Sequence, residues 1–161
     1  IIRPPLVYGV GVKGNFSSLL KLMRKPLPLP FGAIHNLRSF IALDNLISFI
    51  TLCVDLKESI DAGNQIFLIS DDEDVSTTKL LETVGQALKS CSSSSSQAWL
   101  FPVPIGLMSF FAWVLGKRDI TIRLFSSLQM DTSKAKNLLG WKPVINMKEQ
   151  LTKMLEDTGR Q

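Results

Sequence analysis

A glycine-rich motif near the start of the chain is the first candidate for chemistry. Residues 9–14 read GVGVKG, which matches the G-x-G-x-x-G pattern that binds dinucleotides between a strand and a helix. Two features argue against that function: Pro4 and Pro5 would each remove a hydrogen-bond donor from the first strand, and no acidic residue lies about 20 positions on to meet a ribose. The motif predicts either a dinucleotide-binding turn or, as we favour, a bend that brings Asn15 and its helix to a ligand.

Cysteine, histidine and acidic residues offer no evident metal chemistry. Cys53 lies in an apolar run typical of a buried thiol, and Cys91 opens a serine run. His35 is the single histidine and has no second ligand at metal spacing. The acidic run 71–74 is interpreted as a solvated loop. We therefore expect no metal site, and the cysteine usage favours a reducing, cytoplasmic location.

The composition is that of an ordinary globular domain. The chain has 161 residues, of which 45% are hydrophobic and 20% charged. Its 18 basic and 14 acidic residues give a net charge of +4, and they are scattered, without the aromatic-studded basic groove of a nucleic-acid-binding protein. This balance suits an anionic small molecule. The apolar stretch 105–115 is shorter than the roughly 20 residues that cross a bilayer, so we expect no membrane span.

Apolar residues alternate or recur with helical spacing along the chain, which predicts an α/β fold. Helices are expected where apolar residues return every three or four positions, and strands where they alternate or run together. The short strands indicate a small mixed sheet with several helices rather than a complete doubly wound sheet. The predicted strands are 1–8, 37–43, 65–70 and 99–103, and the predicted helices are 16–24, 44–56, 76–89, 105–115, 131–139 and 147–157.

Three segments carry more specific predictions. Alternating prolines hold 25–32 extended, with carbonyl groups free to meet a ligand. Five serines at 92–96 are expected to form a low-complexity surface loop. In the helix 44–56 the spacing directs a set of apolar side chains toward the core: Leu46, Ile47, Phe49, Ile50 and Val54.

Five segments together resemble the extended short-chain dehydrogenase/reductase family, and in particular its bacterial NAD-dependent nucleotide-sugar epimerases. They are RPPLVYGVGVKGNF (3–16), PLPLPFG (26–32), RSFIALDNL (38–46), NQIFLISDDEDVSTTKLL (64–81) and RLFSSLQMDTSKAKNLLGW (123–141). Their order and spacing match the second half of the family across nearly the whole chain. The resemblance implies a Rossmann-type fold of which residues 1–161 are one carboxy-terminal, substrate-binding lobe. It implies a UDP-glucose 4-epimerase-like function in surface-polysaccharide synthesis.

The same resemblance implies that the catalytic residues lie upstream of Ile1. The family's glycine-rich NAD loop, its catalytic Ser/Thr and its Tyr-x-x-x-Lys motif precede the matched region. The chain alone is therefore expected to be inactive, and NAD to be bound mainly by the absent amino-terminal part. The single tyrosine, Tyr8, is followed four positions later by Val12 instead of lysine. Pro4 and Pro5 match the bend that passes the nicotinamide ring and are the expected cofactor contacts.

What the chain retains, by resemblance, is a site for a UDP-sugar. Guanidinium groups suit a diphosphate, and an apolar slot with backbone hydrogen bonds suits uracil. Arg38 and Arg123 match family arginines that contact the nucleotide's phosphates, and each has the alternative of a solvated surface arginine. The other matched substrate-binding residues, for which a helix cap or a proline-rich surface loop is the alternative, are Asn15, Phe16, Leu29, Pro30 and Phe31.

Other functions share these residues. A nucleotide-sugar dehydratase or a 4-reductase of the same family would present the same nucleotide-binding groups. A non-catalytic nucleotide-sugar-binding or interaction module is the alternative outside enzymology. In each case a UDP-sugar is the expected partner, and a homodimer of the full-length protein is compatible with the resemblance.

Overall fold

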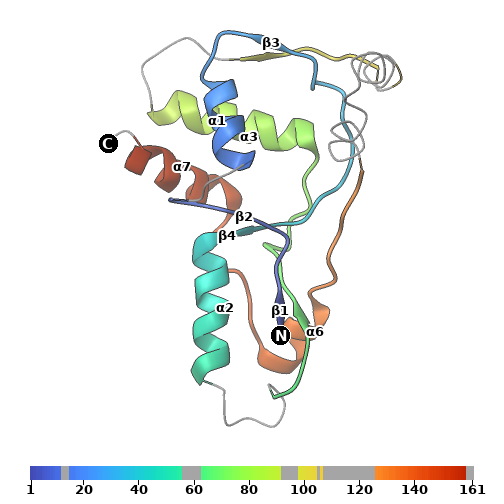
Figure 1. The fold of residues 1–161 in the computed structure, drawn as a ribbon, viewed down its shortest axis with the longest axis vertical. Coiled ribbons are helices and arrows are strands. Elements are labelled where there is room, and N and C mark those ends of the chain that lie inside the picture. The colour runs from blue at the N-terminus through green and yellow to red at the C-terminus, as the bar shows by residue number, and fades with distance from the viewer. Residues whose placement is uncertain (12–14, 56–62, 92–97, 105, 107–125, 159–161) are drawn as a thin grey trace. The chain divides into compact units, whose positions relative to one another are not determined.

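The computed structural model describes residues 1–11, 15–55, 63–91, 98–104, 106 and 126–158 (Figure 1). The chain divides into two compact units, each built from segments far apart in the sequence. Unit 1 comprises Ile1–Val12, Ser39–Asp74 and Gln129–Gln161, and unit 2 comprises Lys13–Arg38 and Val75–Leu128. Because both units are discontinuous, no single cut in the sequence separates them.

Unit 1 contains two pairs of parallel strands. β1 (Ile2–Arg3) pairs with β5 (Phe67–Leu68), and β2 (Leu6–Tyr8) pairs with β4 (Phe40–Ala42). The predicted strand over 1–8 is present but is interrupted between β1 and β2 at two prolines, which lack the N–H group that a ladder needs. All three residues of β4 are buried, as expected for a strand in a covered parallel sheet.

The described residues of unit 1 form the helices α2 (Leu43–Asp55), α6 (Ser133–Leu139) and α7 (Met147–Thr158). α6 ends at Gly140, whose φ of 63° is a left-handed conformation that glycine adopts without strain. In the core, Phe49 makes edge-to-face contacts with Phe67 and Trp141, with ring centroids 5.7 and 5.2 Å apart. Further buried residues of this cluster are Ile41, Ile69 and Ala135.

The predicted orientation of α2 is wrong for most of its apolar side chains. Phe49 is buried and Leu46 packs against the core cluster. Ile47, Ile50 and Val54 are instead 53%, 43% and 59% exposed within the described structure. These three residues recur at helical spacing and form a second apolar stripe on the helix. A helix that is apolar on two sides has a pattern that cannot show which side is buried.

The described part of unit 2 includes helices α1 and α3 and one parallel strand pair. α1 (Asn15–Met23) contacts α3 (Thr77–Cys91), where the Met23 side chain lies against Gly85. β3 (Pro28–Leu29) pairs with β6 (Trp99–Leu100), which confirms that the proline-rich segment is extended. The buried apolar residues that these helices contribute are Phe16, Leu20, Met23, Leu80, Leu81, Val84, Ala87 and Leu88.

Arg38 marks the point in unit 2 where three segments meet. It forms an antiparallel bridge with Val75 and a parallel bridge with Leu128. These two bridges and the three parallel strand pairs together make up short parallel and antiparallel β-pairing, which is combined with the helices. The predicted α/β fold is confirmed.

Several predictions fall on residues that the structure does not describe. They are the serine loop 92–96, Arg123, and the helix 105–115 apart from Gly106, which is helical. In the described parts of the chain, no helix is both long and apolar enough to pass through a bilayer.

Candidate functional site

The segment predicted to meet uracil consists of the end of β3 and the turn behind it. Leu29 is buried, and its carbonyl accepts a hydrogen bond from the Phe101 N–H at 3.0 Å. The Phe31 carbonyl lies 2.7 Å from the Thr78 hydroxyl, which donates to it. Among the described residues, the Pro30 carbonyl and the Phe31 N–H have no hydrogen-bond partner. The segment therefore offers one free backbone acceptor and one free backbone donor, which belong to a single trans peptide group and face opposite sides of it.

A close approach of two backbones fixes this turn against β6. The Gly32 N–H donates to the Phe101 carbonyl at 3.1 Å. A Cβ atom on Gly32 would lie 2.8 Å from the Phe101 carbonyl carbon and 2.9 Å from the Pro102 nitrogen. Because both neighbours are backbone atoms that cannot turn aside, glycine is needed here, and the turn has little freedom to shift.

The backbone of Arg38 is held on both sides. Its N–H donates to the Val75 carbonyl at 3.1 Å, and its carbonyl accepts the Val75 N–H at 3.0 Å. The preceding residue, Leu37, accepts the Leu128 N–H at 2.9 Å and donates its own N–H to the Ser127 hydroxyl at 3.1 Å. Arg38 itself is half-buried. Its guanidinium thus extends from a backbone position fixed by two neighbouring segments.

The structure groups the predicted site residues by unit. Of the predicted substrate-binding residues, those described all belong to unit 2, where Asn15 begins α1 and Phe16 is buried with 3% of its surface exposed. Phe16 can therefore meet a ligand only through its backbone. The two predicted cofactor contacts, Pro4 (exposed) and Pro5 (half-buried), lie in unit 1 between β1 and β2.

Two glycines of the G-x-G-x-x-G motif, Gly9 and Gly11, are required by the local structure. A Cβ atom on Gly9 would lie 2.6 Å from the Leu43 Cβ and 3.0 Å from the Gln150 amide nitrogen, and its φ is +154°. Gly11 has a φ of +74°, which is strained for other residues. These two glycines permit close packing and a left-handed bend in unit 1, so neither needs a dinucleotide to explain it; Gly14 lies outside the described residues.

A buried polar cluster in unit 1 was missed by the sequence analysis. Asp71 is 8% exposed, and its carboxylate accepts hydrogen bonds from the Tyr8 hydroxyl at 2.6 Å and the Asn45 amide at 2.7 Å. It also accepts the Ala42 N–H at 2.9 Å. The Asn45 amide oxygen in turn accepts the Val144 and Ile145 N–H groups at 2.8 and 3.0 Å. One carboxylate therefore joins β2, β4, α2 and, through Asn45, the loop before α7.

The interpretation of 71–74 as a solvated loop is consequently wrong for Asp71. The other aspartates of the run are also engaged: Asp72 accepts the Thr132 hydroxyl at 2.6 Å and pairs with Lys136 at 2.9 Å. Asp74 accepts the Ser39 hydroxyl at 2.5 Å and the Gln129 amide at 2.8 Å. These carboxylates serve the packing of unit 1.

The environment of Tyr8 excludes it as a tyrosinate base. Tyr8 is fully buried, and its hydroxyl donates to Asp71. Burial raises the pKa of Tyr8 strongly, and the negative charge of Asp71 raises it further. A general base must be deprotonated near the working pH, and this phenol is not.

Asp71 should leave a signature in the pH dependence of stability. Burial raises the pKa of Asp71 above its ordinary value of 3.8, although hydrogen bonds from Tyr8, Asn45 and Ala42 oppose the shift. The folded protein therefore holds this proton more tightly than the unfolded chain. The stabilising contribution is fully present below pH 3.8 and is lost as pH rises through the folded pKa.

Urea unfolding at a series of pH values, for the wild type and Asp71→Asn, checks this prediction. As pH falls toward 3.8, the wild type should gain stability relative to Asp71→Asn, in which the titrating group is absent. The prediction would be contradicted if the free energies of unfolding of the two proteins changed in parallel with pH, or if their difference changed in the opposite direction.

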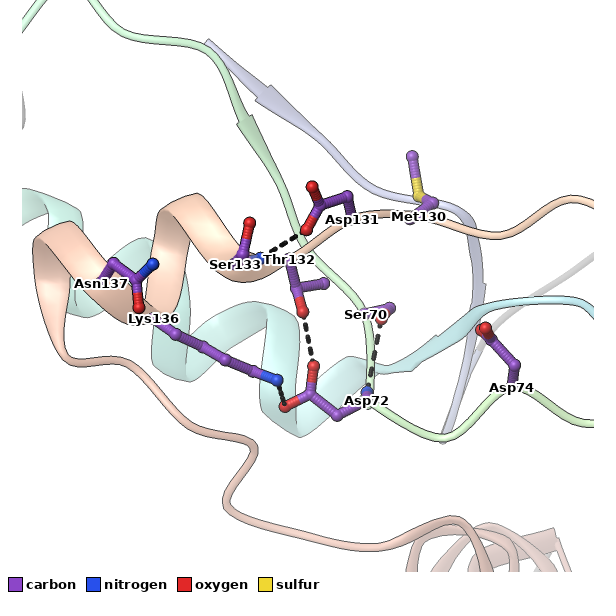
Figure 2. Close-up of a pocket in the computed structure, with 9 residues that line it drawn as sticks. All are labelled: Ser70, Asp72, Asp74, Met130, Asp131, Thr132, Ser133, Lys136 and Asn137. Atoms are coloured by element: carbon purple, nitrogen blue, oxygen red, sulfur yellow. Dashed lines mark hydrogen bonds and ion pairs between the residues drawn. The ribbon is translucent and has the colours of Figure 1, made fainter.

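A cavity of about 290 Å³ in unit 1 lies at the start of α6 (Figure 2). Three aspartates line it, Asp72, Asp74 and Asp131, together with Lys136. Figure 2 shows the Asp72 carboxylate between Thr132 and Lys136, with the Lys136 ammonium pointing to it and not into open space. Lys136 is thus the only cationic side chain among the described residues that line this cavity, and it is already paired with Asp72. The cavity has an acidic lining that would repel a diphosphate.

A second cavity in unit 1, of about 230 Å³, is acidic as well. Asp71, Glu73 and Glu149 line it beside the loop 143–147. Glu149 and Asn146 form a reciprocal capping box at the start of α7, with hydrogen bonds of 3.0 and 3.2 Å. Neither cavity includes a residue predicted to bind substrate. Across the described residues, no three metal-ligating side chains cluster together.

Comparison with known proteins finds similar sequences and similar solved structures. No protein-family model matches the chain. A UDP-glucose 4-epimerase of Vibrio cholerae is 44% identical over 150 residues, which are 92% of this chain and 43% of that protein. This similarity confirms the predicted resemblance to the nucleotide-sugar epimerases of the extended short-chain dehydrogenase/reductase family.

Solved structures of other proteins share the fold of this chain. The UDP-N-acetylglucosamine 4-epimerase of Bacillus cereus superposes with a TM-score of 0.65 at 15% identity, over 99% of this chain and 47% of that one. The Bordetella bronchiseptica enzyme WbmG, in complex with NAD and UDP, gives 0.59 at 16% identity, over 99% of this chain and 44% of that one. The epimerase-like chain therefore spans less than half of the length of these relatives.

Proposed function

We propose that the chain provides the UDP-sugar-binding part of an NAD-dependent nucleotide-sugar 4-epimerase, which interconverts C4 epimers through a 4-keto intermediate. The observation that carries this proposal is the 44% identity, over 150 residues, with a UDP-glucose 4-epimerase. Within this chain, unit 2 contributes the nucleotide-binding groups and unit 1 the two prolines near the cofactor.

The turn after β3 is proposed to bind the uracil. Uracil carries carbonyl acceptors, so it can accept a hydrogen bond from a backbone N–H that has no other partner. The Phe31 N–H is such a donor among the described residues; the Pro30 carbonyl also lacks a partner there, but it belongs to the same trans peptide group, points the opposite way and would not meet the same edge of the base. Because the Leu29 side chain is buried and its carbonyl is taken by β6, its role is to hold the strand in place.

Arginines are proposed to bind the diphosphate. A guanidinium donates two parallel hydrogen bonds to phosphate oxygens and stays charged at every working pH. Arg38 has a fixed backbone in unit 2, and Arg123 is five residues upstream of Leu128, whose backbone bridges to Arg38. Asn15, at the amino terminus of α1, would add an amide and the favourable helix dipole.

The fit of NAD to unit 1 is limited to an apolar contact. Pro4 is exposed and presents a ring without hydrogen-bond donors, which suits the edge of a nicotinamide and little else. NAD, when bound, would accept the hydride from the sugar and return it. Pro4 and Pro5 would orient that ring, and the phosphates of the cofactor would need groups beyond these two prolines.

Replacing Arg38 by alanine tests the proposed nucleotide site. We expect the affinity for UDP to fall on the order of tenfold to a hundredfold, because a charge-assisted hydrogen bond is worth roughly 1.5–3 kcal/mol. The backbone hydrogen bonds that hold Arg38 between its neighbouring segments remain in this variant. Isothermal calorimetry, or NMR titration where binding is weak, gives the measurement.

Arg24→Ala is the matched control, since Arg24 is an exposed arginine of the same unit just after α1. It removes the same charge and should leave UDP affinity within about twofold. Equal losses of UDP affinity in both variants would mean that the effect is one of net charge, and no loss in Arg38→Ala would remove Arg38 from the site.

Assaying the whole enzyme for an epimerised sugar, without net reduction of NAD, separates an epimerase from a dehydratase or reductase.

A further inference from the structure

The loop 31–38, which runs from the proposed uracil contact to Arg38, is anchored to the first turn of α3. Near its start, the Thr78 hydroxyl lies 2.7 Å from the Phe31 carbonyl and 3.0 Å from the Ile34 carbonyl. It also accepts the Ile34 N–H at 3.0 Å. A hydroxyl has one hydrogen to donate, so its bond to Phe31, the nearer carbonyl, is the stronger. Thr78 thus holds the turn beside the unpaired Phe31 N–H.

The other end of the loop is anchored by Asn36, which is 7% exposed. Its amide oxygen accepts the Thr77 N–H at 2.9 Å and the Thr77 hydroxyl at 3.0 Å. Its amide nitrogen donates to the Ser126 carbonyl at 3.2 Å. One side chain therefore joins the start of α3, the segment 126–128 and the residues immediately before Arg38.

We propose that Thr78 and Asn36 are positioning residues that set the separation between the uracil contact and Arg38. This inference rests on the proposed function. The base and the diphosphate of one nucleotide are a fixed number of bonds apart, so groups that bind both must keep a matching separation. Adjacent residues of α3, Thr77 and Thr78, provide the common anchor for the two ends of the loop.

The two residues should have different binding signatures. Thr78→Val keeps the side-chain shape and removes the hydroxyl, so the turn loses its anchor; affinity for uridine and for UDP should both fall about tenfold. Thr78→Ser restores the hydroxyl and should restore both affinities. Asn36→Ala frees the chain before Arg38, so UDP affinity should fall about tenfold while uridine, which has no phosphate, should bind as before.

Double substitution gives a readout that general destabilisation would not produce. If Asn36 acts through Arg38, Asn36→Ala should cause no further loss of UDP affinity in the Arg38→Ala background. Leu88→Val is the stability control, because Leu88 is a buried residue of α3 outside the loop contacts. It should lower Tm and leave both affinities unchanged. NMR titrations with UDP and with uridine, on the 161-residue chain, provide these values.

The outcomes separate this inference from the function on which it rests. The proposed function itself is contradicted if the wild-type chain does not bind UDP, or if Arg38→Ala leaves the affinity for UDP unchanged. UDP binding that depends on Arg38 but is unchanged in Asn36→Ala and Thr78→Val overturns only the positioning role. Parallel losses in Leu88→Val would do the same, since stability alone would then explain them. A chain that binds UDP but not uridine overturns the role of Thr78.

Discussion

The 161-residue chain, supplied with NAD, should convert no detectable UDP-galactose to UDP-glucose. The reaction needs a base that takes the proton of the sugar hydroxyl, and the single tyrosine of the chain cannot serve. Tyr8 is buried, bonded to Asp71 and shifted to a higher pKa, whereas the required tyrosinate needs a lowered one. Val12 also stands where Tyr-x-x-x-Lys would place the lysine.

The Vibrio cholerae UDP-glucose 4-epimerase is the natural positive control in the same assay. A hybrid in which this chain replaces the matched 43% of that protein should be active, if the chain supplies substrate binding and the remainder supplies the chemistry. Turnover by the isolated chain that disappears in Tyr8→Phe would show that the base lies here after all. Turnover that persists in Tyr8→Phe would require another base within the chain.

Asp71→Ala should destabilise the protein by about 2–6 kcal/mol, since each of two buried donors left without an acceptor costs about 1–3 kcal/mol. The substitution removes the Asp71 acceptor from the Tyr8 hydroxyl and the Ala42 N–H, whereas the Asn45 amide nitrogen keeps the Ile145 carbonyl as an acceptor. Buried donors without a partner keep the full cost of their lost hydration, so the loss exceeds that of an ordinary hydrogen bond. Because typical domains are stable by only about 5–15 kcal/mol, the variant will be close to unfolding at room temperature.

Denaturant unfolding followed by circular dichroism measures this loss. Tyr8→Phe removes one donor and keeps the carboxylate, so it should cost only about 0.5–1.5 kcal/mol. Glu82→Ala removes an exposed carboxylate from α3 and should behave nearly as the wild type. If Asp71→Ala resembles Glu82→Ala, the carboxylate is solvated in solution and the buried cluster is not formed.

The individual elements were largely predictable because they depend on local patterns. The helix expected over 16–24 is α1, Asn15–Met23, and the helix expected over 44–56 is α2, Leu43–Asp55. Pairing was not predictable from such patterns: nothing local in Pro28–Leu29 indicates that β6 is its partner. The exposed stripe of α2 was missed for a related reason, since burial depends on which elements pack and not on the helix alone.

The residues of the candidate site could likewise be predicted only in part. Arg38 and the uracil segment could be proposed because the resemblance marks them, and their roles stay predictions. Asp71 was misjudged because a charged residue is usually solvated, while its partners Tyr8 and Asn45 are 63 and 26 positions away. Thr78 and Asn36 were overlooked because a threonine at a helix start and an asparagine in a loop have common structural uses. Only their remote partners distinguish them.

The parallel pairing of the strands also affects how fast the chain reaches its native state. Ile2 pairs with Phe67, Leu6 with Phe40 and Pro28 with Trp99, so each ladder joins segments separated by long stretches of sequence (Figure 1). Closing such loops costs entropy before any hydrogen bond or burial repays it. Proteins dominated by such contacts refold orders of magnitude more slowly than helical bundles. During that search the apolar strand segments remain open to other molecules, and low protein concentration will favour recovery over aggregation.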